Sequence, residues 1–371
     1  MQNKIKINRT EESIALIKAL ASRDRNEAYE AQLALAAFVG PLVSEFIAKA
    51  RTLSSLFTTL EYDAFDSPSI PVDLYYDITA EDEIQVWSQT TANGLATNFM
   101  QPVESDMKFH TNELNSAWHF DNKNVRAGRA DVVGKTLTKI MQAIMILQDR
   151  YSAQLLLGTI SDSLSTNTIT STAATQTLQP EDVNALQTLS KRLNSAWNGG
   201  TPANGRGGPT DLILSPERME DIRAMAYNPV NNAGANGTVG AATSGVVSAP
   251  DSLRDQVWSG GGIASFWGLG LMEILELGPG QVYTEIFQTL VAAAGGTFVT
   301  AVDDVVIGID RSKESCLRAV ALDQDTGAQF TIEPDDQFAN RLKKTGFIGS
   351  VEEGRLVIDS RALTAIIVDA V

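Results

Sequence analysis

The longest periodic segment of the sequence, residues 130–157, constrains the fold more than any other feature. Its apolar residues recur every three or four positions for about seven turns, as on one face of an α-helix. Gly158 follows, where glycine commonly ends a helix. At 1.5 Å per residue this helix is roughly 40 Å long, which predicts an elongated body. Its apolar residues are Val133, Leu137, Ile140, Met141, Ile144, Leu147, Tyr151 and Leu155.

The first fifty residues predict an amphipathic arm. Helical spacing of apolar residues extends over 11–21 and again over the alanine-rich segment 27–38. Gly40-Pro41 is expected to break or kink the second helix, which then resumes through Ile47. The apolar stripe of this arm needs a surface to cover it. Its own domain or a neighbouring chain provides that surface.

Residues 71–121 change to a two-residue period, which predicts a long, loosely paired ribbon of two strands. Arms of about fifteen residues reach roughly 50 Å. An isolated two-stranded ribbon is marginal in water. The aromatic residues Tyr75, Trp87, Phe109 and Trp118 therefore indicate that the ribbon needs a partner.

The remaining elements mix helices and strands without regular alternation, which favours an α+β fold. Residues 161–177 predict a loop or short strand, and the Gly/Ala-rich segment 231–250 is too long for an ordinary connection. Further helices are expected at 180–197 and 216–226, and strands at 210–214, 266–277, 305–309, 317–322 and 329–332, with 355–358 and 363–368 as a last pair.

Charge and cysteine content exclude several classes of function. The chain carries 45 acidic and 29 basic residues, a formal charge of −16, so its surface repels phosphate. Cys316 is the only cysteine, which excludes an intrachain disulfide and a cysteine-rich zinc module; an ordinary strand cysteine is expected.

No apolar run is long enough to cross a bilayer, and the first residues lack the apolar core of a secretory signal. A cytosolic protein without membrane partners is expected.

One segment resembles a phosphate-binding loop. Gly128 and Gly134, followed by Lys135-Thr136, are separated by five residues, whereas a P-loop has four. Such a loop follows a buried strand, but this segment falls within the periodic helix. We therefore expect Lys135 on a solvated helix face. A nucleotide-dependent enzyme using Gly134-Lys135-Thr136 is the alternative that this segment would support.

The other titratable residues do not predict an active site. His110, Glu113, His119 and Asp121 lack the spacing of a zinc helix, so surface histidines are expected. Adjacent acidic residues point apart, and we expect them in solvated turns. These acid pairs are Asp303-Asp304, Asp335-Asp336 and Glu352-Glu353. We predict no catalytic residue, cofactor or metal.

Four features in this order resemble the HK97-type fold of the major capsid proteins of tailed bacteriophages: an N-terminal arm, an extended E-loop, a spine helix and an inserted axial (A) domain before the chain returns to the peripheral (P) domain. Residues 266–275 resemble an A-domain strand. Residues 303–310, 338–341 and 354–362 resemble closing P-domain strands. Some members crosslink a lysine to an asparagine. Lys108 lies on the ribbon, but no motif identifies its partner.

The resemblance implies a domain organisation that follows this order along the chain. The expected parts are the arm 1–55, the first part of the P domain 56–70 and 122–185 with the spine helix 130–157, the E-loop 71–121, the A domain 186–300 and the returning P-domain strands 301–371.

The resemblance implies a structural subunit that assembles with itself into pentamers and hexamers of an icosahedral shell around double-stranded DNA, which it contacts weakly. The alternative within this fold is an encapsulin-like nanocompartment. The chain begins almost directly with the arm, so a separate scaffolding protein is expected, together with a portal and possible decoration proteins. The expected location is the virion capsid, assembled in the host cytoplasm.

Overall fold

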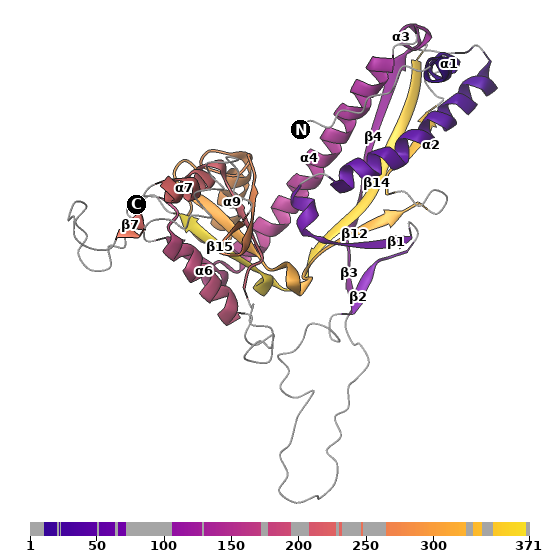
Figure 1. The fold of residues 1–371 in the computed structure, drawn as a ribbon. Helices are drawn as coiled ribbons and strands as arrows, with labels where there is room; N and C mark the ends of the chain where they lie inside the picture. Colours follow the sequence, from indigo (N-terminus) through magenta and orange to yellow (C-terminus); the bar gives the residue numbers. More distant parts are fainter. Residues whose placement is uncertain are drawn as a thin grey trace, which may run out of the picture. The chain divides into compact units, whose positions relative to one another are not determined.

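The computed structural model forms two compact units. Unit 1 comprises Met1–Ile70, Asp106–Ser152 and Leu317–Leu356, and unit 2 comprises Pro71–Ser105, Ala153–Cys316 and Val357–Val371. Each is described by itself (Figure 1). The structure describes residues 11–20, 22, 24–49, 52–63, 66–71, 106–127, 130–171, 177–193, 208–227, 230–231, 246–247, 265–323, 329–335 and 344–368.

A five-stranded sheet forms the centre of unit 1, and its long strand β14 pairs along both edges. On one edge β14 pairs antiparallel with β4, from Lys344 opposite Asp121 to Gly354 opposite Thr111. On the other it pairs with β13 and β12, and β1 runs parallel beside β12. The strands are β1 (Thr58–Asp63), β4 (Thr111–Asp121), β12 (Cys316–Leu322), β13 (Thr331–Asp335) and β14 (Lys344–Val357).

Helices cover one face of this sheet because the side chains of β14 alternate between the two faces. Phe347 and Val351 are buried, whereas Ile348 between them is exposed. In Figure 1, β4 and β14 lie alongside α2 and α4. The helical elements are α1 (Glu11–Ala19), α2 (Arg25–Lys49), η1 (Leu53–Leu56), α3 (Asn122–Arg126) and α4 (Ala130–Asp162).

Aromatic residues of β4 and β14 form the centre of the core of unit 1. The rings of Trp118 and Phe347 stack at 6.1 Å, and Phe120 meets Phe347 edge-on. Side chains from both long helices complete the cluster, so α2 and α4 pack on the same face of the sheet. Its main members are Ile17, Leu20, Leu35, Val39, Val43, Leu114, Trp118, Phe120, Val133, Leu137, Met141, Ile144, Phe330, Phe347 and Val351.

The expected end of α4 at Gly158 is wrong, and α2 shows no break at Gly40-Pro41. α2 continues across Gly40-Pro41, since Val39 and Val43 are both buried and hold the helix on either side of the expected break. α4 continues past Gly158 to Asp162 because Leu157 and Ile160 are buried around the glycine.

The prediction of a free ribbon over residues 71–121 is wrong for its second strand. β4 pairs with β14 along its whole length, which places it in the five-stranded sheet. Phe109 and Trp118 are therefore buried within unit 1, and they do not need a neighbouring chain to cover them. A short pair of strands, β2 (Ser69–Pro71) and β3 (Asp106–Lys108), lies where the chain enters and leaves the segment 72–105. Tyr75 and Trp87 lie outside the described residues.

A six-stranded sheet forms the centre of unit 2, in the order β5-β15-β11-β6-β10-β9. β15 and β11, the second and third strands of this order, pair antiparallel, and both have every residue buried. Two further strands, β7 (Val230–Asn231) and β8 (Val246–Val247), pair where the Gly/Ala-rich segment begins and ends. The sheet strands are β5 (Thr168–Ser171), β6 (Asp211–Leu214), β9 (Ser265–Phe266), β10 (Leu269–Glu273), β11 (Asp304–Ile309) and β15 (Leu363–Val368).

Helices of unit 2 pack against this sheet through a second apolar cluster. Val183 and Leu186 of α6 and Ile222 of α7 contribute fully buried side chains to it. Pro180 and Pro216 begin these helices, as the sequence predicts. The helical elements are α5 (Leu164–Asn167), α6 (Pro180–Leu193), α7 (Pro216–Tyr227), α9 (Val282–Ala293), η2 (Arg311–Lys313) and η3 (Ser360–Ala362).

Three strand predictions are corrected. Residues 266–277 form the two strands β9 and β10 and a turn, rather than one strand. The expected last pair does not form, because 355–358 falls mostly in β14, which belongs to the other sheet, while β15 pairs with β11 and β5. The helix α9 was not predicted. The closing residues 338–341 and Trp197 lie outside the described residues.

Because β14 has one buried and one exposed face, truncating a side chain is expected to lower the free energy of unfolding by different amounts on the two faces. Phe347→Ala removes a ring from the core of unit 1 and is expected to lower the free energy of unfolding by about 3–5 kcal/mol. Ile348→Ala, at the next position on the exposed face, is expected to cost less than about 1 kcal/mol. Urea denaturation of both variants measures the difference. Equal costs would contradict the assigned faces.

Candidate assembly surface

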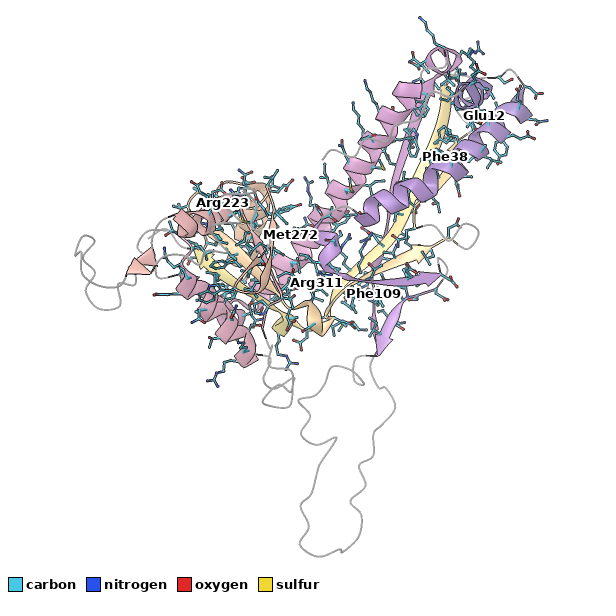
Figure 2. All side chains as sticks on the ribbon, in the orientation of Figure 1. Glu12, Phe38, Phe109, Arg223, Met272 and Arg311 are labelled. Atoms are coloured by element: carbon cyan, nitrogen blue, oxygen red, sulfur yellow. The ribbon has the colours of Figure 1, made fainter. Side chains whose placement is uncertain are left out.

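One side of α2 is apolar and exposed. We call it the arm surface, and define it as the exposed residues Tyr29, Leu33, Ala34, Ala37 and Phe38. Phe38, labelled in Figure 2, has 61% of its surface exposed. Contiguous exposed apolar surface of this kind marks an interaction site, whereas single exposed apolar residues are normal.

The sequence of α2 explains why it has two apolar faces. Ala31, Leu35, Val39 and Val43 follow the four-residue spacing of a helix stripe and are buried in unit 1. No charged residue occurs between Glu30 and Glu45, so the opposite side of this helix segment is also apolar. One face is therefore covered within the chain, and the arm surface stays exposed among the described residues.

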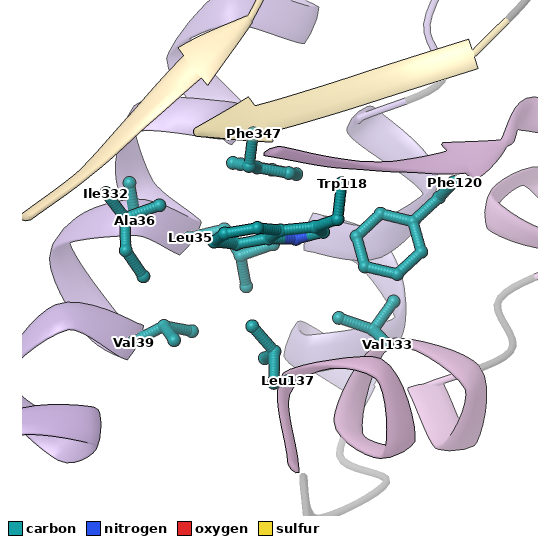
Figure 3. A pocket seen from close by; sticks show the side chains of 9 residues that line it. All are labelled: Leu35, Ala36, Val39, Trp118, Phe120, Val133, Leu137, Ile332 and Phe347. Atoms are coloured by element: carbon teal, nitrogen blue, oxygen red, sulfur yellow. The ribbon is translucent and has the colours of Figure 1, made fainter. Parts of the chain in front are cut away.

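An apolar space between described residues of α2, α4 and the sheet is too small to hold a ligand. Figure 3 shows the indole of Trp118 below Phe347, with side chains of α2 and α4 on the other side. The free volume is about 10 Å³, roughly the threshold for one water molecule. The space is a packing seam, lined by Leu35, Ala36, Val39, Trp118, Phe120, Val133, Leu137, Ile332 and Phe347.

The residues that resemble a phosphate-binding loop lie inside a helix. Gly134, Lys135 and Thr136 belong to the first turns of α4, and the side chain of Lys135 is exposed. A helix α3, rather than a buried strand, precedes α4. The backbone amides at this position therefore belong to the helix and do not encircle a phosphate. The structure places Lys135 as the sequence predicts.

The two histidines lie at or near β4 and are exposed, with Glu113 and Asp121 exposed as well. Nε2 of His119 lies 2.8 Å from Nζ of Lys344 on the paired strand. Among the residues that the structure describes, no three histidine, cysteine or acidic side chains come together as metal ligands.

Cys316 begins β12 and is buried, as expected for a strand cysteine. Burial raises the pKa of its thiol to about 12. Since the thiolate is the reactive form, this position suits an inert side chain rather than a nucleophile.

The prediction that the adjacent acid pairs lie in solvated turns is wrong for two of them. Asp303 and Asp304 are buried in unit 2, and Glu353 is buried in unit 1. Asp304 accepts hydrogen bonds from Ser215 and from Nε of Arg218, and burial raises the pKa of its carboxyl. Sequence reasoning missed Asp304 and Glu353 because Arg218 and Arg318, which compensate their charges, are distant along the chain. The strand alternation around them was the available signal.

Glu353 is the centre of an ion cluster in unit 1. Its carboxylate accepts hydrogen bonds from Arg318 at 2.7 and 2.9 Å, from Arg355 at 2.7 Å and from Gln148 at 3.1 Å. Arg355 also donates to Ser54 of η1 at 3.0 Å. Burial, the largest influence, lowers the pKa of Arg355. The cluster joins β12, β14, α4 and η1, so its role is to hold these elements together.

Within the described part of the chain, no helix combines the length and the apolarity that crossing a membrane requires.

Comparison with known proteins identifies the fold. No family model and no curated protein matches the chain. A chain from the capsid structure of the cyanophage P-SCSP1u is similar to it with a TM-score of 0.50 and 11% identity, over 86% of this chain and 88% of that chain. This likeness confirms the expected α+β fold of a phage capsid protein.

Two further solved structures are similar over most of the chain. The holo-SrpI encapsulin complex from Synechococcus elongatus PCC 7942 has a TM-score of 0.46 and 10% identity, over 85% of both chains. The virus-like particle from Pyrococcus furiosus has a TM-score of 0.41 and 14% identity, over 92% of this chain and 99% of that chain.

The ion cluster predicts that substitutions of two neighbouring glutamates lower the free energy of unfolding by very different amounts. Glu353→Gln leaves Arg318 and Arg355 buried without their anion, and is expected to lower the free energy of unfolding by about 3–5 kcal/mol. Glu352→Gln, on the other face of β14, weakens a hydrogen bond from Tyr62 and is expected to cost about 1 kcal/mol. Urea denaturation at pH 7 gives both values. A smaller loss for Glu353→Gln than for its neighbour would refute the assigned role.

Proposed function

We propose that this chain is the structural subunit of the icosahedral shell that encloses the double-stranded DNA of a tailed bacteriophage. The observation that carries the proposal is the fold, which matches a cyanophage capsid chain over 86% of this chain. Because one fold can serve several functions, the proposal also requires a surface for assembly. The arm surface supports it.

The division into units supports an assignment of the parts of the capsid fold. Unit 1, with the arm helices and the long strand β14, corresponds in this proposal to the P domain. Unit 2, with its six-stranded sheet, corresponds to the A domain, extended beyond 186–300 by residues on both sides. Residues 72–105, between β2 and β3, correspond to the E-loop.

Assembly follows from what each subunit leaves uncovered. The buried stripe of α2 fixes the arm on its own unit, so the arm surface has a fixed position relative to the sheet of unit 1. A neighbouring subunit then covers Tyr29, Leu33 and Phe38. Such contacts repeat around a closed shell. Each contact is weak, but together they stabilise the particle.

Electrostatics suit a container for DNA. The net charge of −16 disfavours tight binding to phosphate, so DNA is held by confinement and contacted weakly. The location that follows is the virion capsid, assembled in the host cytoplasm with a separate scaffolding protein and a portal. In this role the chain has no catalytic function.

A nanocompartment shell is the second candidate, because an encapsulin is among the similar solved structures. The two candidates differ in what the particle holds. Particles purified from infected or prophage-induced cells are expected to contain DNA. Particles that enclose an enzyme and no DNA would favour the nanocompartment.

Removal of the proposed E-loop tests assembly without disturbing the core. The deletion must end before β4, since Trp118 belongs to the core of unit 1. Replacing residues 72–105 by a short Gly/Asn turn between β2 and β3 is expected to leave a folded subunit that forms no shells. Electron microscopy and circular dichroism measure both properties, with the full chain as the reference. Normal shells from this variant would contradict the proposed role of the segment.

A substitution on the arm surface tests the uncovered face of α2. Phe38→Ser is expected to raise the protein concentration needed for assembly by about tenfold, because a contact aromatic is lost. Its matched control is Ile146→Ser on α4, where the side chain is 58% exposed but is not part of the arm surface. Light scattering over a concentration series measures the threshold. Equal thresholds for the two variants would refute a special role for the arm surface.

A further inference from the structure

The hairpin of β9 and β10 presents a tryptophan in an unfavourable backbone conformation. Phe266 pairs with Leu269, so Trp267 and Gly268 form a two-residue loop. Both have positive φ, 53° and 79°, as in a type I′ turn. Asparagine and glycine favour this turn, whereas a bulky side chain at positive φ is strained. Trp267 and Glu314 are the only non-glycine residues of positive φ in the described part of the chain.

The stability of unit 2 does not explain this tryptophan. Trp267 stacks on Phe266 at 5.9 Å, yet 51% of its surface is exposed. An asparagine would form the same turn with less strain. Strained residues persist where function requires them, and tryptophan is enriched at the centres of protein interfaces. The indole therefore points to a contact outside its own unit.

A second apolar surface of unit 2 lies around the start of α9. We call it the α9 patch and define it as Leu275, Val282, Val299 and Val302, all exposed. Two backbone hydrogen bonds join the segments that carry it. The amide of Gly280 donates to the carbonyl of Thr300 at 2.7 Å, and that of Tyr283 donates to the carbonyl of Glu276 at 3.0 Å. Leu275 has 70% of its surface exposed.

The two surfaces lie at opposite ends of one strand. Trp267 precedes β10, and Leu275 follows it. Five strand residues span roughly 15 Å, which is beyond the reach of one side chain. Trp267 therefore cannot cover the α9 patch of its own copy, and among the described residues both surfaces stay exposed.

We propose that Trp267 of one copy packs on the α9 patch of the next copy, head to tail. This inference rests on the proposed function as a shell subunit. One kind of contact then covers both surfaces, and each copy uses two different surfaces. Such a contact closes into a ring when the rotation between copies allows it. A contact between two identical surfaces would instead give a twofold dimer. The Trp267 contact thus builds the ring of a capsomer through unit 2.

The first test measures two quantities, the concentration needed for assembly and the Tm of the unassembled subunit. A residue with an interface role changes the first without lowering the second. Trp267→Asn is expected to raise the concentration needed for assembly by about tenfold, while the Tm of the unassembled subunit stays the same or rises. Val302→Ser, in the α9 patch, is expected to raise the threshold in the same direction. An unchanged threshold for Trp267→Asn, or a lower Tm, would overturn the inference.

The second test establishes which surfaces meet. Cys316, the only native cysteine, is buried, so introduced cysteines carry the reaction. Treating particles of the double variant Trp267→Cys, Leu275→Cys with a short bis-maleimide is expected to give a ladder of covalent oligomers. The single variant Trp267→Cys is expected to give none. Dimers from that single variant would show that the Trp267 loops of two copies contact each other, and would overturn the head-to-tail arrangement.

The outcomes also separate this inference from the function on which it rests. If the unmodified chain forms no particles, the proposed function fails. If particles form but the double variant gives no ladder, only the contact between Trp267 and the α9 patch fails. In that case another partner, such as a scaffolding protein, covers the tryptophan.

Discussion

The pairing of β4 with β14 is the constraint on which unit 1 depends. It joins residues 111–121 to residues 344–354, far apart in the sequence, and aligns Trp118 with Phe347 under the two long helices. Gly349 permits this arrangement, because a Cβ there would lie 2.5 Å from Phe330 and 2.8 Å from Trp118. The same face continues to Glu353. The core and the ion cluster therefore follow from one strand register.

Buried charge has the same role in both units. Glu353 with Arg318 and Arg355, and Asp304 with Arg218, are carboxylates removed from water and compensated by guanidinium groups. Such clusters are costly to break, because removing one partner leaves an uncompensated buried charge. The clusters join elements that are distant in sequence. Because they are buried, the exposed residues are available for other contacts.

In the proposed function, the uncovered apolar surfaces are the contacts between subunits. α2 has one apolar face buried in unit 1 and a second exposed, and unit 2 exposes Trp267 and the α9 patch. An isolated subunit with these surfaces is incomplete in the sense that water contacts apolar groups that a neighbour would cover. Self-association is the arrangement that covers them without a different partner. This agrees with a fold that the cyanophage capsid chain shares.

The sequence by itself determined the long helix α4, the helices that begin at Pro180 and Pro216, the α+β class and most of the buried strands, because periodicity reports which side of an element is apolar. It also placed Lys135 on a helix. Only the tertiary structure decided that β4 joins β14, that Glu353 is buried, and that Trp267 stands in a tight turn. The physical reason is that a pattern shows that a face must be covered, whereas the partner that covers it depends on contacts between residues distant along the chain.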